Sequence, residues 1–223
     1  MPFSIFAQGL RRFSTDRPKK PVKESWSFLS EIAGNPALAG RGISISAGEI
    51  LKLVDLAGAS SAIMHIGHGR LNTLAFDHLD FLTPIFHGEQ VHMDARVAHV
   101  GSTSVAVHCV GRKKDLMSRG WIHTHEALVV YVALGPDGRP EKAPELVCET
   151  AEEQQFREMV KCRLQLGKVY QSEQEAISAS AFTATSPETE SAEETQHQER
   201  IDMEDTELRL RKIFMPRNLN ALG

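Results

Sequence analysis

GEILKLVDLAG, residues 48–58, carries the longest helical pattern in the first half of the chain. Its apolar side chains share one face when successive residues are turned by about 100°; they are Ile50, Leu53, Val54 and Ala57. Asp55 lies across the helix from that face, beside Lys52. The pattern predicts a helix over residues 48–64, and it raises the question of whether Asp55 is a solvated acid or one placed for chemistry.

The segments after this helix alternate in the manner of β-strands. In EQVHMDARVAHV, residues 89–100, every second residue is apolar, so one side of the strand is expected to be buried. Four strands are predicted, over residues 71–82, 89–100, 104–114 and 125–135. A long helix followed by a run of antiparallel strands predicts an α+β architecture, with the sheet wrapped around the helix.

The composition is that of a globular protein. The chain has 223 residues, of which 41% are hydrophobic and 24% charged. A net charge of −4 gives no electrostatic argument for binding nucleic acid, and no apolar run approaches the roughly 20 residues that cross a bilayer. The three cysteines lack CxxC spacing, which favours a reducing compartment over a disulfide framework or a cysteine zinc site.

The first twenty residues differ from the rest. They hold five arginines and lysines against one acid, and they begin with an apolar stretch. A basic, acid-poor start of this kind is typical of a mitochondrial presequence, so residues 1–20 predict location in the mitochondrial matrix. An ordinary basic N-terminus is the alternative.

The last third of the chain is predicted to lie outside the main domain, which is assigned to residues 21–148. Residues 149–168 have helix formers, paired charges and a thin apolar stripe, as in a surface or connecting helix. The following residues up to 199 contain no lysine or arginine, so residues 149–200 are assigned as a connecting helix and an acidic linker. A strand is expected over residues 206–216.

Several short motifs between residues 40 and 146 occur in a fixed order. They are Ala47-Gly48 at the helix start, Asp55, Asp77 and Phe81, Pro84, Gly88-Glu89, and the turn VGSTS at 100–104. Together they resemble the acyl-CoA thioesterases of the hotdog fold. The resemblance implies hydrolysis of fatty acyl-CoA to free fatty acid and coenzyme A, with no cofactor and no metal.

The C-terminal sequence RLRKIFMPRNLNALG resembles the opening of a second hotdog unit. The layout is therefore similar to the tandem, double-hotdog acyl-CoA hydrolases, including the mitochondrial ones. By this resemblance, residues 201–223 hold the first strand and loop of an incomplete second unit.

The resemblance also implies roles for individual residues. Asp55 acts as general base or nucleophile, and Asn220 of a second unit supplies an amide, because Gly40 stands where the first unit would carry its asparagine. The backbone at Ala47 and Gly48 holds the thioester oxygen at the helix N-terminus. The coenzyme A phosphates pass the turn Gly101, Ser102, Thr103 and Ser104.

Structural roles without any catalytic or binding function stay open for each of these candidate residues. Asp55 can be a solvated acid paired with Lys52, and the turn at 101–104 can be an ordinary polar hairpin. The basic run at 112–114 can meet phosphates or form a solvated strand end. His123 and His125 share a strand face, but without further clustered ligands they give little support for a metal site.

The resemblance leaves three functional classes. The first is the thioesterase, expected as a homodimer or trimer of dimers because a single hotdog leaves one sheet edge and one helix face uncovered. The second is a non-catalytic hotdog protein that binds acyl-CoA or serves in assembly. The third, a dehydratase or isomerase on the same fold, calls for a histidine or paired acids on the helix, where only Asp55 is assigned a catalytic role.

Overall fold

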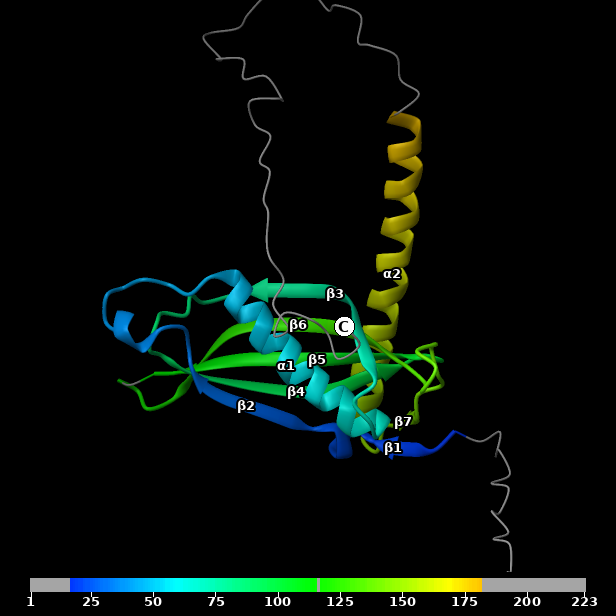
Figure 1. Ribbon diagram of the computed structural model, residues 1–223, viewed down its shortest axis with the longest axis horizontal. Coiled ribbons are helices and arrows are strands. Elements are labelled where there is room, and N and C mark those ends of the chain that lie inside the picture. The colour runs from blue at the N-terminus through cyan, green and yellow to red at the C-terminus, as the bar shows by residue number, and fades with distance from the viewer. Residues whose placement is uncertain (1–16, 116, 182–223) are drawn as a thin grey trace, which may run out of the picture. The chain divides into compact units, whose positions relative to one another are not determined.

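The computed structural model describes residues 17–115 and 117–181 (Figure 1). Contacts divide the chain into two compact units, residues 1–162 and 163–223. The fold and the candidate site belong to the first unit. Its centre is one long helix, α1 (Ala47–Ile66), which lies against one face of a sheet in Figure 1.

The ends of α1 follow from its local sequence. Ser46 caps the N-terminus, because its hydroxyl accepts a hydrogen bond from the Glu49 N–H at 3.3 Å. Gly67 ends the helix in the left-handed conformation, with φ of +95°. The predicted helix over residues 48–64 is confirmed, with one added residue at the start and two at the end. All four residues of its predicted apolar face are buried.

The sheet has five antiparallel strands in the order β2-β4-β5-β6-β3. Their bounds are Ser27–Ile32 for β2, Leu71–Phe81 for β3, Gln90–Val100 for β4, Ser104–Lys114 for β5 and Trp121–Ala133 for β6. The four predicted strands are all present, and the predicted α+β hotdog architecture is confirmed. Strand β6 begins four residues earlier than predicted, and β2 was not predicted.

Bulges adjust which side chains face the helix. The predicted alternation in β4 is present up to Val97, and Ala98 is then buried as well because the register shifts between Val97 and His99. Strand β3 carries two such shifts, which give the bend expected within residues 71–82. Since β3 is last in the strand order, one of its edges has no strand beside it among the described residues.

The remaining elements are short, apart from the second helix. They are β1 (Lys19–Pro21), which pairs in parallel with β7 (Glu145–Val147), the 3-10 turns η1 (Val22–Ser25) and η2 (Pro36–Leu38), and α2 (Ala151–Ala181). Helix α2 runs thirteen residues beyond the predicted end at 168, since residues 169–181 contain neither glycine nor proline. No helix within the described residues has the length and apolar character needed to span a membrane.

Some predictions fall where the structure is not described. The strand expected over residues 206–216 lies outside the described residues, and so do residues 1–16 of the expected presequence. The predicted boundaries after residues 20, 148 and 200 stay predictions.

Candidate active site

Asp55 lies at the middle of α1, half buried, with its side chain turned toward two strands. The Thr73 hydroxyl on β3 donates a hydrogen bond to Asp55 Oδ1 at 2.8 Å. The Tyr131 hydroxyl on β6 donates to the main-chain oxygen of Asp55 at 3.0 Å and lies 3.4 Å from Oδ1. The contacts of this carboxylate within the described residues therefore come from the sheet, and the structure does not show the alternative of a solvated acid paired with Lys52.

The floor beneath Asp55 is tightly packed. Tyr131 is fully buried, and its hydroxyl lies against Gly58, where an added Cβ would sit 2.4 Å from it. Cys109 is also fully buried, and its thiol donates to the Val54 carbonyl at 3.8 Å. Burial, with the charge of Asp55 beside it, raises the pKa of the Cys109 thiol to about 12, so it stays protonated and is no nucleophile at neutral pH.

The helix N-terminus forms a second feature, at Ala47 and Gly48. The first N–H groups of a helix have no intrahelical acceptor and lie at the positive end of its dipole. A Cβ added at Gly48 would meet only the Ser46 hydroxyl, at 3.9 Å, so the space over this turn is open. Apolar side chains beside it, with Ala47, line a cavity of about 340 Å³.

The structure does not bring Asp55 and the helix N-terminus of the same chain together. Asp55 follows Ala47 by eight residues, which is about 12 Å along the axis at 1.5 Å per residue. A thioester carbonyl bound to the N-terminal N–H groups is therefore out of reach of that carboxylate. Within one chain, these two predicted features therefore stay apart.

The turn Gly101–Ser104 is a hairpin between β4 and β5. The Gly101 N–H donates to the Ser104 carbonyl at 2.8 Å, and the Ser102 carbonyl accepts from the Ala143 N–H at 3.1 Å. Pro144 follows Ala143 in the chain, and its carbonyl oxygen lies 3.0 Å from the ring nitrogen Nε2 of His65, near the end of α1. The hairpin thus lies at the C-terminal end of α1, away from Ala47, and its role toward phosphates stays a prediction.

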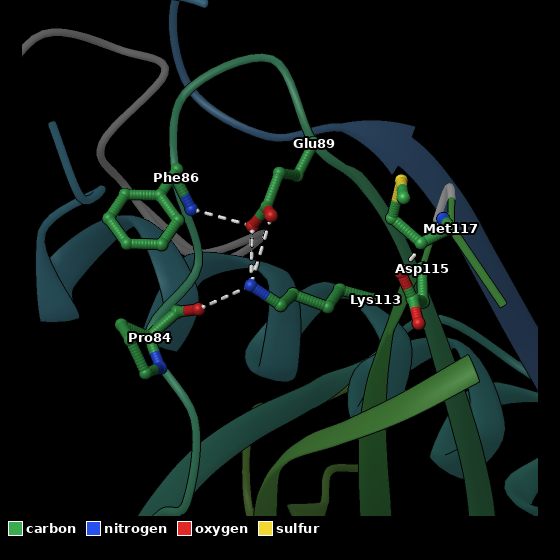
Figure 2. Close-up of polar contacts among 6 residues, drawn as sticks. All are labelled: Pro84, Phe86, Glu89, Lys113, Asp115 and Met117. Carbon is green, nitrogen blue, oxygen red and sulfur yellow. Dashed lines mark hydrogen bonds and ion pairs between the residues drawn. The ribbon is translucent and has the colours of Figure 1, made fainter. Parts of the chain in front are cut away.

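The basic run at 112–114 is engaged within the chain. Figure 2 shows the Lys113 ammonium donating to the Pro84 carbonyl at 2.9 Å and to the Glu89 carboxylate at 2.9 Å, while Glu89 also accepts from the Phe86 N–H. Lys113 is only 7% exposed. Arg112 is paired with Asp94. Lys113 therefore fastens the loop before β4 to the sheet and is not a solvated strand end.

The other predicted residues give mixed outcomes. Asn220 lies outside the described residues. Gly40 has φ of +74° and open space where a Cβ would be, and it lines a cavity of about 740 Å³. His125 is fully buried, and residues 17–115 and 117–181 contain no group of three histidine, cysteine or acidic side chains that could hold a metal. Thr73 and Tyr131 were not predicted.

A sheet wrapped around one helix, with a carboxylate held at the centre of that helix, defines a hotdog protein with a candidate hydrolytic site. Residues 44–118 match the model of the thioesterase superfamily. The acyl-CoA thioester hydrolase YciA of Salmonella typhimurium is 32% identical over 112 residues, which are 49% of this chain and 84% of that protein. The chain belongs to the thioesterase superfamily, among the acyl-CoA thioester hydrolases.

Solved structures agree on the fold. An acyl-CoA hydrolase from Staphylococcus aureus, in complex with butyryl coenzyme A, coenzyme A and coenzyme A disulfide, superposes with a TM-score of 0.64 at 24% identity, covering 74% of this chain and 99% of that one. A structure described as an apo-hexameric acyl-CoA thioesterase has a TM-score of 0.62 at 24% identity, covering 69% and 97%.

Proposed function

We propose that this protein hydrolyses fatty acyl-CoA thioesters to free fatty acid and coenzyme A, with Asp55 as its general base or nucleophile. The observation that carries the proposal is the carboxylate itself. One oxygen of Asp55 is held by Thr73, and the residue is partly exposed at the centre of the helix. The family relationship supports acyl-CoA as the substrate class.

In the general-base step, Asp55 accepts a proton from water while the water oxygen bonds to the thioester carbon. The carbonyl oxygen gains negative charge, which helix N-terminal N–H groups can stabilise. When the carbon–sulfur bond then breaks, the leaving thiolate takes the proton back from Asp55. The products are the free acid and the coenzyme A thiol, and Asp55 returns to its charged form.

The donors for that oxygen come, in this proposal, from a second copy of α1. Residues 47, 51 and 55 follow one another at intervals of four, so Ala47, Leu51 and Asp55 share one stripe of the helix. If two helices run antiparallel with Leu51 on the two-fold axis, Ala47 of each lies beside Asp55 of the other. One dimer then contains two sites, each built from both halves.

The exposed surface around β3 supports this assembly. Its edge carries large apolar side chains, among them Leu74 at 66% exposure, and Leu56 of α1 is 51% exposed. We propose a homodimer that can associate further into a trimer of dimers, which agrees in subunit number with the thioesterase described as hexameric.

Cross-linking tests the proposed axis. In a Cys148→Ser, Cys162→Ser background, Leu51→Cys is expected to form a disulfide between two copies, because a residue on a two-fold axis meets itself. Lys52→Cys, about 100° around the helix, is the matched control and is expected to stay reduced. Equal cross-linking of both variants would contradict the proposed axis.

The amide is assigned to Asn220 of a second unit, following the family resemblance, since Gly40 supplies none. Residues 1–20 are assigned as a mitochondrial presequence and the matrix as the compartment. A fusion of residues 1–20 to a fluorescent protein tests this assignment, and a cytosolic signal would contradict it.

Thiol release from acyl-CoAs of several chain lengths tests the activity. Asp55→Asn keeps the size of the side chain and is expected to lower kcat by about 10²- to 10⁴-fold, the usual contribution of a general base. Asp137→Asn, in an exposed turn, is the control and is expected to keep the wild-type rate. An undiminished rate in Asp55→Asn would remove Asp55 from the mechanism.

One observation favours the non-catalytic alternative, namely the glycine at position 40 with open space around it. A hotdog without a working amide can bind acyl-CoA and fail to turn it over. Calorimetric binding of acyl-CoA by this chain without thiol release would establish that alternative.

A further inference from the structure

The two oxygens of the Asp55 carboxylate have different surroundings. Two hydroxyls converge on Oδ1, that of Thr73 at 2.8 Å and that of Tyr131 at 3.4 Å. Within the described residues no hydrogen bond is formed to Oδ2. The Thr73 donor and the adjacent Tyr131 hydroxyl restrict the rotation of the carboxylate, which leaves the other oxygen for the reacting water or carbonyl carbon.

Tyr131 also contacts the main chain of the same residue, because its hydroxyl donates to the Asp55 carbonyl oxygen at 3.0 Å. A hydroxyl has one proton, so at any moment it donates to the main-chain oxygen or to Oδ1. Both acceptors belong to Asp55. Through the main-chain contact, Tyr131 fixes the distance between the helix backbone at Asp55 and the sheet. Through the contact with Oδ1, it limits the rotation of the Asp55 side chain.

We infer that Tyr131 is a positioning residue for hydrolysis, which acts through Asp55 and does not touch the substrate. The inference rests on the proposed function. It differs from the ordinary role of a buried tyrosine, whose hydroxyl merely needs an acceptor. Here the single residue that accepts this hydroxyl is also the proposed base.

The surroundings of Tyr131 make it suited to this role. It is fully buried in β6, the strand between β5 and β3, and its ring is held against Gly58 of α1. Burial raises the pKa of the Tyr131 phenol, and the nearby Asp55 carboxylate adds to the effect. The hydroxyl stays protonated, so it remains a donor whenever Asp55 is charged.

A substitution at Gly58 perturbs the contact between Tyr131 and Asp55 independently. Because a Cβ at this position would lie 2.4 Å from the Tyr131 hydroxyl, Gly58→Ala displaces the hydroxyl without removing it. Displacement and deletion are expected to affect the same step, so the two changes should not be additive.

The experiment is steady-state thiol release by the full-length wild type, Tyr131→Phe, Gly58→Ala and their double variant. Tyr131→Phe is expected to lower kcat by about 10- to 100-fold, since small misplacements of a reacting group have effects of this size, while KM stays nearly constant. The double variant is expected to match Tyr131→Phe alone. Tyr170→Phe removes the hydroxyl of the only other tyrosine, which is 71% exposed, and is expected to keep the wild-type rate.

A second comparison separates positioning from a purely structural role. In the Asp55→Asn background, assayed at high enzyme concentration, Tyr131→Phe is expected to cause little further loss of rate. Three results would overturn the inference and leave the proposed function intact. They are an equal loss of rate on Tyr131→Phe in the wild-type and Asp55→Asn backgrounds, a change in KM alone, or a wild-type kcat in Tyr131→Phe. A wild-type protein without thiol release would instead overturn the proposed function, and this inference with it.

Discussion

The substitution Gly58→Ala is the sharpest test of how α1 packs on the sheet. Alanine in the interior of a helix is normally more stable than glycine by up to about 1 kcal/mol. At Gly58, however, the added Cβ would lie 2.4 Å from the Tyr131 hydroxyl oxygen, 3.2 Å from its Cζ and 3.3 Å from the Cys109 sulfur. The first of these separations is shorter than any van der Waals contact, so something must move.

The ring of Tyr131 has little room to move because it is fully buried in the sheet. Overpacking of a core costs about 1–3 kcal/mol, and a 2.4 Å approach belongs in the upper half of that range. Subtracting the helix-propensity gain of about 1 kcal/mol leaves a net loss of about 1–2 kcal/mol. For a chain of this size, that lowers the midpoint of thermal unfolding by about 2–8 °C.

The assay is thermal and urea unfolding at one fixed protomer concentration, since association adds to apparent stability. Gly48→Ala is the matched control on the same helix. Its Cβ would meet nothing closer than 3.9 Å, so that variant is expected to gain a few tenths of a kcal/mol. Removing the hydroxyl as well, in Gly58→Ala with Tyr131→Phe, should restore part of the loss. Equal stability of the two glycine variants, or no recovery in the double variant, would refute the packing argument.

Three further predictions concern buried groups. Burial lowers the pKa of His125 to about 4, so below pH 6.5 the unfolded chain binds a proton that the folded one excludes. The contribution of His125 to stability is full above pH 6.5 and falls by about 3 kcal/mol toward pH 4. Burial also lowers the pKa values of His65, His99 and His108, so His125→Gln should reduce the fall of the urea midpoint across that range without abolishing it. Glu89→Ala removes the carboxylate that pairs with the buried Lys113 ammonium, so the free energy of unfolding in urea should fall by about 3 kcal/mol. Glu149→Ala removes the partner of the exposed Lys23 and should lower it far less. Cys162 should react with a thiol reagent in the native protein and Cys109 only on unfolding, and rapid labelling of Cys109 would contradict its burial.

The elements that the sequence predicted are those with a strong local pattern. The helix carries an apolar stripe at period 3.6, and residues 89–100 carry one at period 2, so each identifies its own buried face. Strand β2 has no such pattern, because SFLSEI mixes exposed apolar residues with a buried serine. Its place is decided by pairing with β4, a contact that the local sequence does not contain.

The same limit applies to the site. Asp55 was identified from its place in an ordered set of motifs, but its partners come from strands 18 and 76 residues away. Tyr131 lies in the apolar second half of β6, residues 127–133, where alternation cannot tell which side faces the helix. The one local signal was Gly58, since glycine within a helix often marks a close approach by another group.

Asp55 alone would supply only one of the groups that thioester hydrolysis needs. Its carboxylate can activate water, but the oxygen of a thioester also needs donors, and the loss of one such donor typically costs 10²- to 10³-fold in rate. Within one chain those donors lie about 12 Å away along α1. In the proposed dimer, the four-residue spacing of Ala47, Leu51 and Asp55 puts Ala47 of a second helix beside Asp55, so hydrolysis and association would depend on the same face. A dissociated protomer is therefore expected to keep its fold and lose most of its rate, which makes specific activity rise with protein concentration across the dissociation range.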